Sequence, residues 1–122
     1  MAWKPTLCLD FDGVIHSYSS GYVCDEEIPD PPVEGAKEFI LEAMEHFTVV
    51  VHSGRCKSPD GIKAIEQWLE DWGFPPIPVL DYKPPAFLSI DDRAITFTGM
   101  WPDVQWLTEF KPWWDHKKPG HI

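Results

Sequence analysis

Short apolar runs alternate with polar, proline-rich segments along the whole chain. Thr6–Phe11 and Phe47–His52 are rich in apolar and β-branched residues and too short for helices, so both predict buried strands. Two more strands are predicted around Val79–Leu80 and over Ala86–Ile90, and a last one over Ala94–Phe97. These runs indicate a sheet built from short strands.

Segments with helical spacing lie between the predicted strands. In Val33–His46, apolar residues recur three or four positions apart, which is the period of an amphipathic helix. A second helix is predicted after Ser58–Pro59, which is an N-cap followed by a first-turn proline, and Gly73 ends it. A third helix is predicted near Val104–Phe110. The order of elements favours an α/β fold with a small parallel sheet flanked by helices.

Two connections between predicted elements limit how the strands can be arranged. Only Tyr82–Pro85 separates the third and fourth predicted strands, whereas a parallel crossover needs about a dozen residues. Either the crossover is reduced to a loop, or these strands are not neighbours in the sheet. The polar stretch Gly13–Asp30, with a turn at Ser19–Gly21, predicts a short β-hairpin flap.

Composition narrows the class of protein. We expect one domain over residues 1–122, with an N-terminal lead at 1–5 and a C-terminal tail at 111–122. Ten Lys and Arg against twenty Asp and Glu give a net charge of −10, which disfavours a large nucleic-acid groove.

The expected compartment is the cytoplasm. No apolar run approaches the roughly 20 residues that span a bilayer, and the first residues do not resemble a signal peptide. Cys8, Cys24 and Cys56 form no CxxC pair, so we expect reduced thiols rather than a zinc site or disulfides.

Polar residues follow three of the predicted strands: Asp10 and Asp12, then Ser53 and Arg55, then Asp91 and Asp92. In an open parallel sheet these strand ends meet at one edge, where ligands bind. Two carboxylates about 7 Å apart repel by about 2.4 kcal/mol at an effective dielectric of 20. A cluster of four needs a cation or a retained proton, and oxygen ligands with room for water suit Mg²⁺.

Each of these features also has an ordinary structural explanation. A single Asp-x-Asp after a strand is often a turn, Ser53–Arg55 alone could be a tight turn, and Lys83 alone is most often a solvated lysine. His16 has no metal-like spacing and is expected on the surface. The tryptophans are expected in core and lid packing.

The ordered combination of motifs is more specific than its parts. It reads LCLDFDGV over Leu7–Val14, VVVHSGR over Val49–Arg55, the lysine Lys83, and LSIDDR over Leu88–Arg93. This set resembles the haloacid dehalogenase superfamily over roughly Thr6 to Phe97, and implies a Rossmann-like fold of that type without a cap domain. The second and fourth motifs also look like those in the phosphatase half of phage polynucleotide kinase, although this chain has no kinase half.

The resemblance implies a Mg²⁺-dependent phosphatase that forms an aspartyl-phosphate. Asp10 would be the nucleophile and a metal ligand, and Asp12 the general acid and base, with its backbone carbonyl on the metal. Ser53 and Gly54 would bind the transferring phosphoryl oxygens. Lys83 would neutralise their charge, although it lies unusually close to the last motif.

The same resemblance gives roles to the last motif and to the arginines. Asp92 is preferred as the direct metal ligand, with Asp91 behind it or paired with Lys83, and the reverse assignment stays open. Arg55 and Arg93 would bind substrate phosphate or fix the loops.

Other functions remain in competition. A receiver domain also clusters acids, a serine or threonine and a lysine, but in a different order along the chain. A non-catalytic binding module with the same fold is the alternative from another class. The substrate could be a nucleotide, a sugar phosphate, a phosphoprotein or a polynucleotide 3′-phosphate, the last disfavoured by charge. The oligomeric state is open, because the aromatic stretch Trp101–Trp114 could cover either the sheet edge or a partner subunit.

Overall fold

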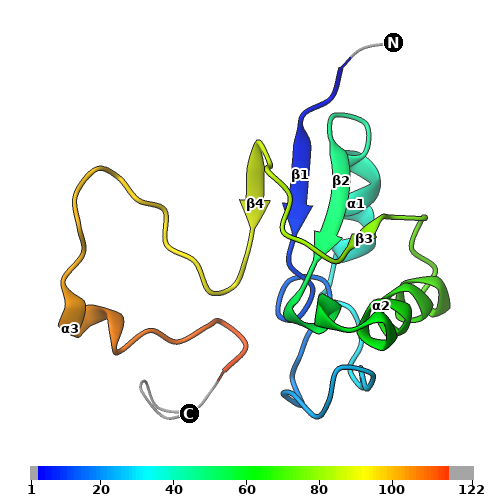
Figure 1. The fold of residues 1–122 in the computed structure, drawn as a ribbon, viewed down its shortest axis with the longest axis horizontal. Helices are drawn as coiled ribbons and strands as arrows, with labels where there is room; N and C mark the ends of the chain where they lie inside the picture. Colours follow the sequence, from blue (N-terminus) through cyan, green and yellow to red (C-terminus); the bar gives the residue numbers. More distant parts are fainter. Residues whose placement is uncertain (1–2, 116–122) are drawn as a thin grey trace.

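The computed structural model describes residues 3–115 and contains a parallel sheet of four strands. The strands are β1 (Thr6–Leu9), β2 (Thr48–His52), β3 (Val79–Leu80) and β4 (Leu88–Ile90), in the order β3-β2-β1-β4 (Figure 1). The predicted α/β class with a parallel sheet is confirmed. β1 ends at Leu9, earlier than its apolar run.

Three α-helices and one 3-10 helix accompany the sheet: α1 (Ala36–Ala43), η1 (Gly54–Lys57), α2 (Pro59–Asp71) and α3 (Val104–Leu107). The start of α2 follows the sequence prediction, because the Ser58 side chain accepts a hydrogen bond from the Gly61 backbone N–H. The helix α1 is shorter than its apolar pattern, since Gly35, at its N-cap, has a left-handed φ of 83°.

The core lies on one face of the sheet. Leu7 and Leu9 of β1 and Val49 and Val51 of β2 belong to one buried cluster that also contains apolar residues of both longer helices. The helical members are Ile40 and Ala43 of α1 and Ile65, Trp68 and Leu69 of α2. Alternate strand residues point to opposite faces, so Cys8 and Val50 face the other side. Burial of each large apolar side chain contributes about 1.5–3 kcal/mol.

The connection between β3 and β4 covers that other side. β3 and β4 lie at opposite edges of the sheet, which confirms the alternative that they are not neighbours. Figure 1 shows the segment between them passing across β2 and β1 on the face opposite α1. It brings Lys83 into a cavity that Cys8 also lines.

The predicted β-hairpin over Gly13–Asp30 is wrong. This segment, all of which is described, forms isolated bridges such as Cys24 with Glu27 instead of paired strands. Local backbone turns and side-chain contacts make its hydrogen bonds. Arg55 donates to three backbone carbonyls of the segment, and Asp30 accepts from both the backbone and the hydroxyl of Ser20.

The strand predicted over Ala94–Phe97 is also wrong. In the described chain the sheet ends at β4, so this run has no partner strand, and Ile95 and Phe97 are exposed. The chain instead forms an extended arm that carries α3, which is shorter than predicted, and then returns toward the sheet (Figure 1). No helix in the described part of the chain is long and apolar enough to cross a membrane.

Candidate active site

The polar residues after β1, β2 and β4 meet at one edge of the sheet. Leu9 pairs with Val51 on one side and with Ile90 on the other, so the residues that follow these strands leave the sheet close together. A cavity of about 320 Å³ opens there, lined among others by Asp10, Ser53, Gly54, Lys83, Asp91 and Arg93. The structure therefore brings together residues of all the sequence motifs.

Three carboxylates form a group that could hold a metal ion. Asp10, Asp91 and Asp92 each offer an oxygen atom, and these oxygens all lie within 4.8 Å of one another. Asp10 and Asp92 are partly buried and Asp91 is exposed. An all-carboxylate set with an exposed member suits Mg²⁺, which prefers oxygen ligands and keeps several waters. Both Asp91 and Asp92 belong to the group, so either can reach the ion.

The environment of Asp10 opposes its negative charge. Burial raises the pKa of Asp10 to about 8, and the nearby carboxyls of Asp92 and Asp91 act in the same direction. The Phe11 backbone N–H donates to Asp10 Oδ1 at 2.8 Å and acts in the opposite direction. A divalent cation between these carboxylates would favour the ionised form, so the donor set fits a metal ion.

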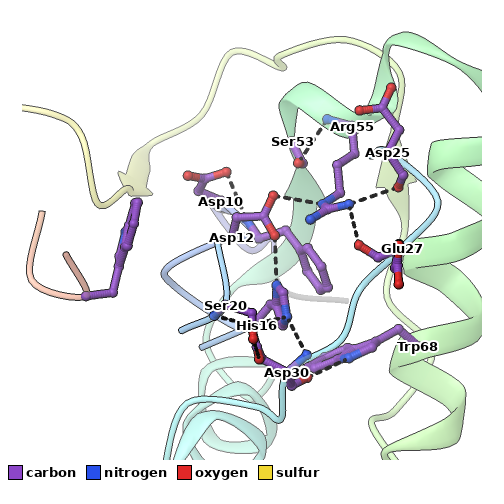
Figure 2. Close-up of polar contacts among 12 residues, drawn as sticks. Asp10, Asp12, His16, Ser20, Asp25, Glu27, Asp30, Ser53, Arg55 and Trp68 are labelled. Carbon is purple, nitrogen blue, oxygen red and sulfur yellow. Dashed lines mark hydrogen bonds and ion pairs between the residues drawn. The ribbon is translucent and has the colours of Figure 1, made fainter. Parts of the chain in front are cut away.

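The Asp12 side chain lies outside this group. Its Oδ2 accepts from Arg55 Nε at 2.8 Å, and its Oδ1 lies 2.8 Å from His16 Nδ1 (Figure 2). Both carboxylate oxygens are thus used by neighbouring side chains.

His16 was expected on the surface, and that prediction is wrong. Its side chain is completely buried and packs against Phe11, with ring centroids 5.5 Å apart, and against Trp68, at 5.6 Å. The Asp30 backbone N–H donates to His16 Nε2 at 3.1 Å, so the proton of the neutral ring is on Nδ1 and is donated to Asp12. The sequence signal for burial is the apolar pair Val14–Ile15 directly before His16.

Arg55 fixes the 24–27 loop. Its side chain is buried, and its NH1 donates to the carbonyls of Cys24, Asp25 and Glu27 at 2.7, 3.0 and 3.1 Å. Figure 2 shows the contacts with Asp25 and Glu27. Its NH2 has no hydrogen-bond partner among the described residues. Of the two roles predicted for Arg55, the structure shows the fixing of a loop.

Ser53 and Lys83 reach the cavity from different elements. Ser53 is buried, and its hydroxyl oxygen accepts from the Arg55 backbone N–H at 3.1 Å, so the hydroxyl hydrogen is left to donate. Lys83 lines the same cavity from the crossover between β3 and β4.

Contacts with its own backbone and with Trp114 hold the last motif. The Arg93 backbone N–H donates to Asp91 Oδ1 at 2.8 Å, and the Trp114 indole N–H donates to Asp92 Oδ2. The Arg93 guanidinium lies over the Trp114 ring, 5.4 Å from its centroid.

Trp113 and Trp114 belong to the site although no motif includes them. The Trp113 indole N–H donates to the Gly13 carbonyl at 2.7 Å, directly beside the first motif acids. The two ends of the aromatic stretch Trp101–Trp114 therefore differ. Trp113 and Trp114 contact the site, whereas Trp101 is highly exposed.

Comparison of the chain with protein-family models, with curated proteins and with solved structures gave no match. The chemistry of the site is therefore inferred from its own residues.

Proposed function

We propose that this protein is a Mg²⁺-dependent phosphatase of the haloacid dehalogenase type, which hydrolyses a phosphate monoester through an aspartyl-phosphate. The observation that carries the proposal is the meeting of Asp10, Asp91 and Asp92 within 4.8 Å at the edge of a cavity that Ser53 and Lys83 also reach. The order of the motifs along the chain and the chemistry of their side chains support the same function.

In the first step, an Asp10 carboxylate oxygen attacks phosphorus, and the bond from phosphorus to the ester oxygen breaks. The leaving oxygen takes a proton from the acid form of Asp12, which is left as the carboxylate. In the second step, water attacks the aspartyl-phosphate with Asp12 as the base, which releases phosphate and restores Asp10.

Charge at the reacting phosphoryl group is balanced by cationic and hydrogen-bonding groups. When bound, Mg²⁺ would supply positive charge beside the nucleophile and favour its ionised form. Lys83 supplies a second positive charge, and the Ser53 hydroxyl donates to a phosphoryl oxygen. Arg93 is exposed beside this cavity and is proposed to contact the substrate.

The proposed substrate class is a small phosphate monoester. The cavity volume is about 320 Å³, and the net charge of −10 opposes binding of a long nucleic-acid strand. Free thiols at all three cysteines accord with a cytoplasmic location, which we also propose.

The test is hydrolysis of p-nitrophenyl phosphate with and without Mg²⁺ by wild type and by Asp10→Asn. We expect turnover that requires Mg²⁺ and is lost in the variant, since the nucleophile is removed. Equal behaviour of the two proteins would contradict enzyme function and favour a non-catalytic module. A panel of nucleoside monophosphates, sugar phosphates and 3′-phosphorylated oligonucleotides then identifies the substrate, and preference for the oligonucleotides would overturn the small-substrate proposal.

A further inference from the structure

The end of the described chain returns to the acidic edge of the sheet. We call Pro112–Trp114 the tryptophan strap. Pro112 is buried and Trp114 is partly buried, in contrast to the exposed apolar residues of the arm that precedes them. The strap therefore has a defined place on the body of the protein.

Two indole N–H groups attach the strap to two different loops. Trp113 donates to the Gly13 carbonyl at 2.7 Å, and Trp114 donates to Asp92 Oδ2. Gly13 follows the first acidic motif and Asp92 belongs to the last, so the strap connects the loops that carry the metal-binding carboxylates.

Gly13 leaves room for this contact. Its φ is +80°, and a Cβ atom at this position would overlap both Asp92 Oδ2 and the Trp114 indole nitrogen. The first motif loop, Asp92 and Trp114 are thus packed in direct contact, with only the glycine hydrogens between them.

An aromatic contact and a cation–π contact hold the Trp114 ring. The Tyr18 ring lies edge-on to it at a centroid distance of 4.7 Å, and the Arg93 guanidinium lies over it at 5.4 Å. Tyr18 has a φ of 60°, which is rare for a residue with a side chain and is maintained by its surroundings. The indole N–H therefore points at Asp92 from a fixed ring.

We propose that Trp114 is a positioning residue that orients the Asp92 carboxylate toward the metal ion, and that Trp113 supports it by fixing the strap on Gly13. The inference rests on the proposed metal site and goes beyond it. With one oxygen held by the indole, Asp92 has less rotational freedom to lose when an ion binds. Groups that orient a metal ligand in this way typically contribute 10–100-fold to metal affinity.

The test is calorimetric titration of the 122-residue chain with Mg²⁺, without substrate. Trp114→Phe keeps an aromatic ring but removes the N–H donor, and we expect it to bind Mg²⁺ about tenfold more weakly than wild type. Trp113→Phe is expected to weaken binding by a smaller factor. Trp101→Phe is the matched control, because this side chain is 86% exposed, and its affinity should equal that of wild type.

A double-mutant cycle separates positioning from general loss of structure. If Trp114 acts through Asp92, then Trp114→Phe added to Asp92→Asn leaves the Mg²⁺ affinity of the Asp92→Asn variant unchanged. Fully additive effects of the two substitutions, or wild-type affinity in both strap variants, would overturn the inference. Absence of Mg²⁺ binding by wild type would instead overturn the proposed metal site, on which this inference rests.

Discussion

Arg55 and Asp12, 43 residues apart in the sequence, form an ion pair in which Arg55 Nε donates to Asp12 Oδ2 at 2.8 Å. The arginine side chain is 1% exposed and the aspartate side chain 18%, so the pair is shielded from water on the arginine side. The same guanidinium also holds the 24–27 loop by its carbonyls. One side chain thus links the proposed acid-base residue to a loop beside the site.

The first prediction concerns removal of this link. Arg55→Met leaves three carbonyls without their donor and Asp12 without its cation, so we expect a loss of about 3–5 kcal/mol in the free energy of unfolding. Urea denaturation measures it. Lys57→Met is the matched control, because Lys57 pairs with Asp25 from a side chain that is 70% exposed, and its loss should be below about 1 kcal/mol. Similar losses in the two variants would contradict the buried link.

The second prediction concerns His16. His16→Phe retains an aromatic ring against Phe11 and Trp68. It removes the ring N–H that donates to Asp12 and the ring nitrogen that accepts from the Asp30 backbone N–H. We expect a loss of about 1–3 kcal/mol in unfolding free energy and, under the proposed function, a lower kcat with little change in KM. Urea denaturation and steady-state kinetics test this. The exposed His46, changed to Phe, should alter neither quantity.

The third prediction is a pH dependence from Asp30. Burial opposes ionisation of Asp30, but hydrogen bonds from the hydroxyl and backbone N–H of Ser20 outweigh it and hold the pKa below its ordinary value. A lowered carboxyl pKa in the folded state adds stability above the unfolded pKa of about 3.9, and this stability is lost as pH falls through the folded pKa.

Ser20→Ala should therefore cost about 1–2 kcal/mol at pH 7, and the cost should shrink as the pH falls below about 4. Urea denaturation of both proteins across this range measures the difference. A cost that stays constant down to pH 2 would show that the hydroxyl acts independently of Asp30 ionisation. Thr96→Ala, at an exposed position, serves as the control.

The fourth prediction compares two helix N-caps. Ser58 caps α2, which packs in the core, and Asp103 caps α3, which has no buried residue. Ser58→Ala should lower the unfolding free energy by about 0.5–2 kcal/mol, whereas Asp103→Ala should leave global unfolding within about 0.5 kcal/mol of wild type. Chemical denaturation distinguishes the two. Equal costs would indicate that α3 folds cooperatively with the sheet.

The meeting of Asp10, Ser53 and Asp91 was predictable because it depends on chain order and strand direction alone. Parallel strands present their carboxyl ends at one edge whatever the loops do. The partners of Asp12 were not predictable, since Arg55 and His16 reach it through an irregular segment whose backbone follows no period. The contact between Trp113 and Gly13, 100 residues apart, depends on the path of the arm, for which the sequence has no local signal.

The predictions of a hairpin over Gly13–Asp30 and of a strand over Ala94–Phe97 were wrong for related reasons. Val14–Ile15 and Tyr22–Val23 have strand-like composition. The backbone N–H groups of Val14 and Ile15 instead donate to the Phe11 carbonyl in a turn, and Arg55 holds the carbonyls that follow Val23. Ala94–Phe97 has the composition of a strand without a neighbour to pair with. Composition indicates which segments can form strands, and pairing decides which of them do.

The segment Asp81–Phe87 crosses the sheet from β3 to β4 and so links its two edge strands directly. This short stretch is the covalent connection from β3 to β4, and so to the aspartates that follow β4. The Pro84–Pro85 pair stiffens the stretch, because proline restricts its own backbone and that of the preceding residue. A single proteolytic cut there would break the covalent link from β3 to the second acidic motif, with the arm and strap behind it, and would leave β4 attached to the sheet through its pairing with β1.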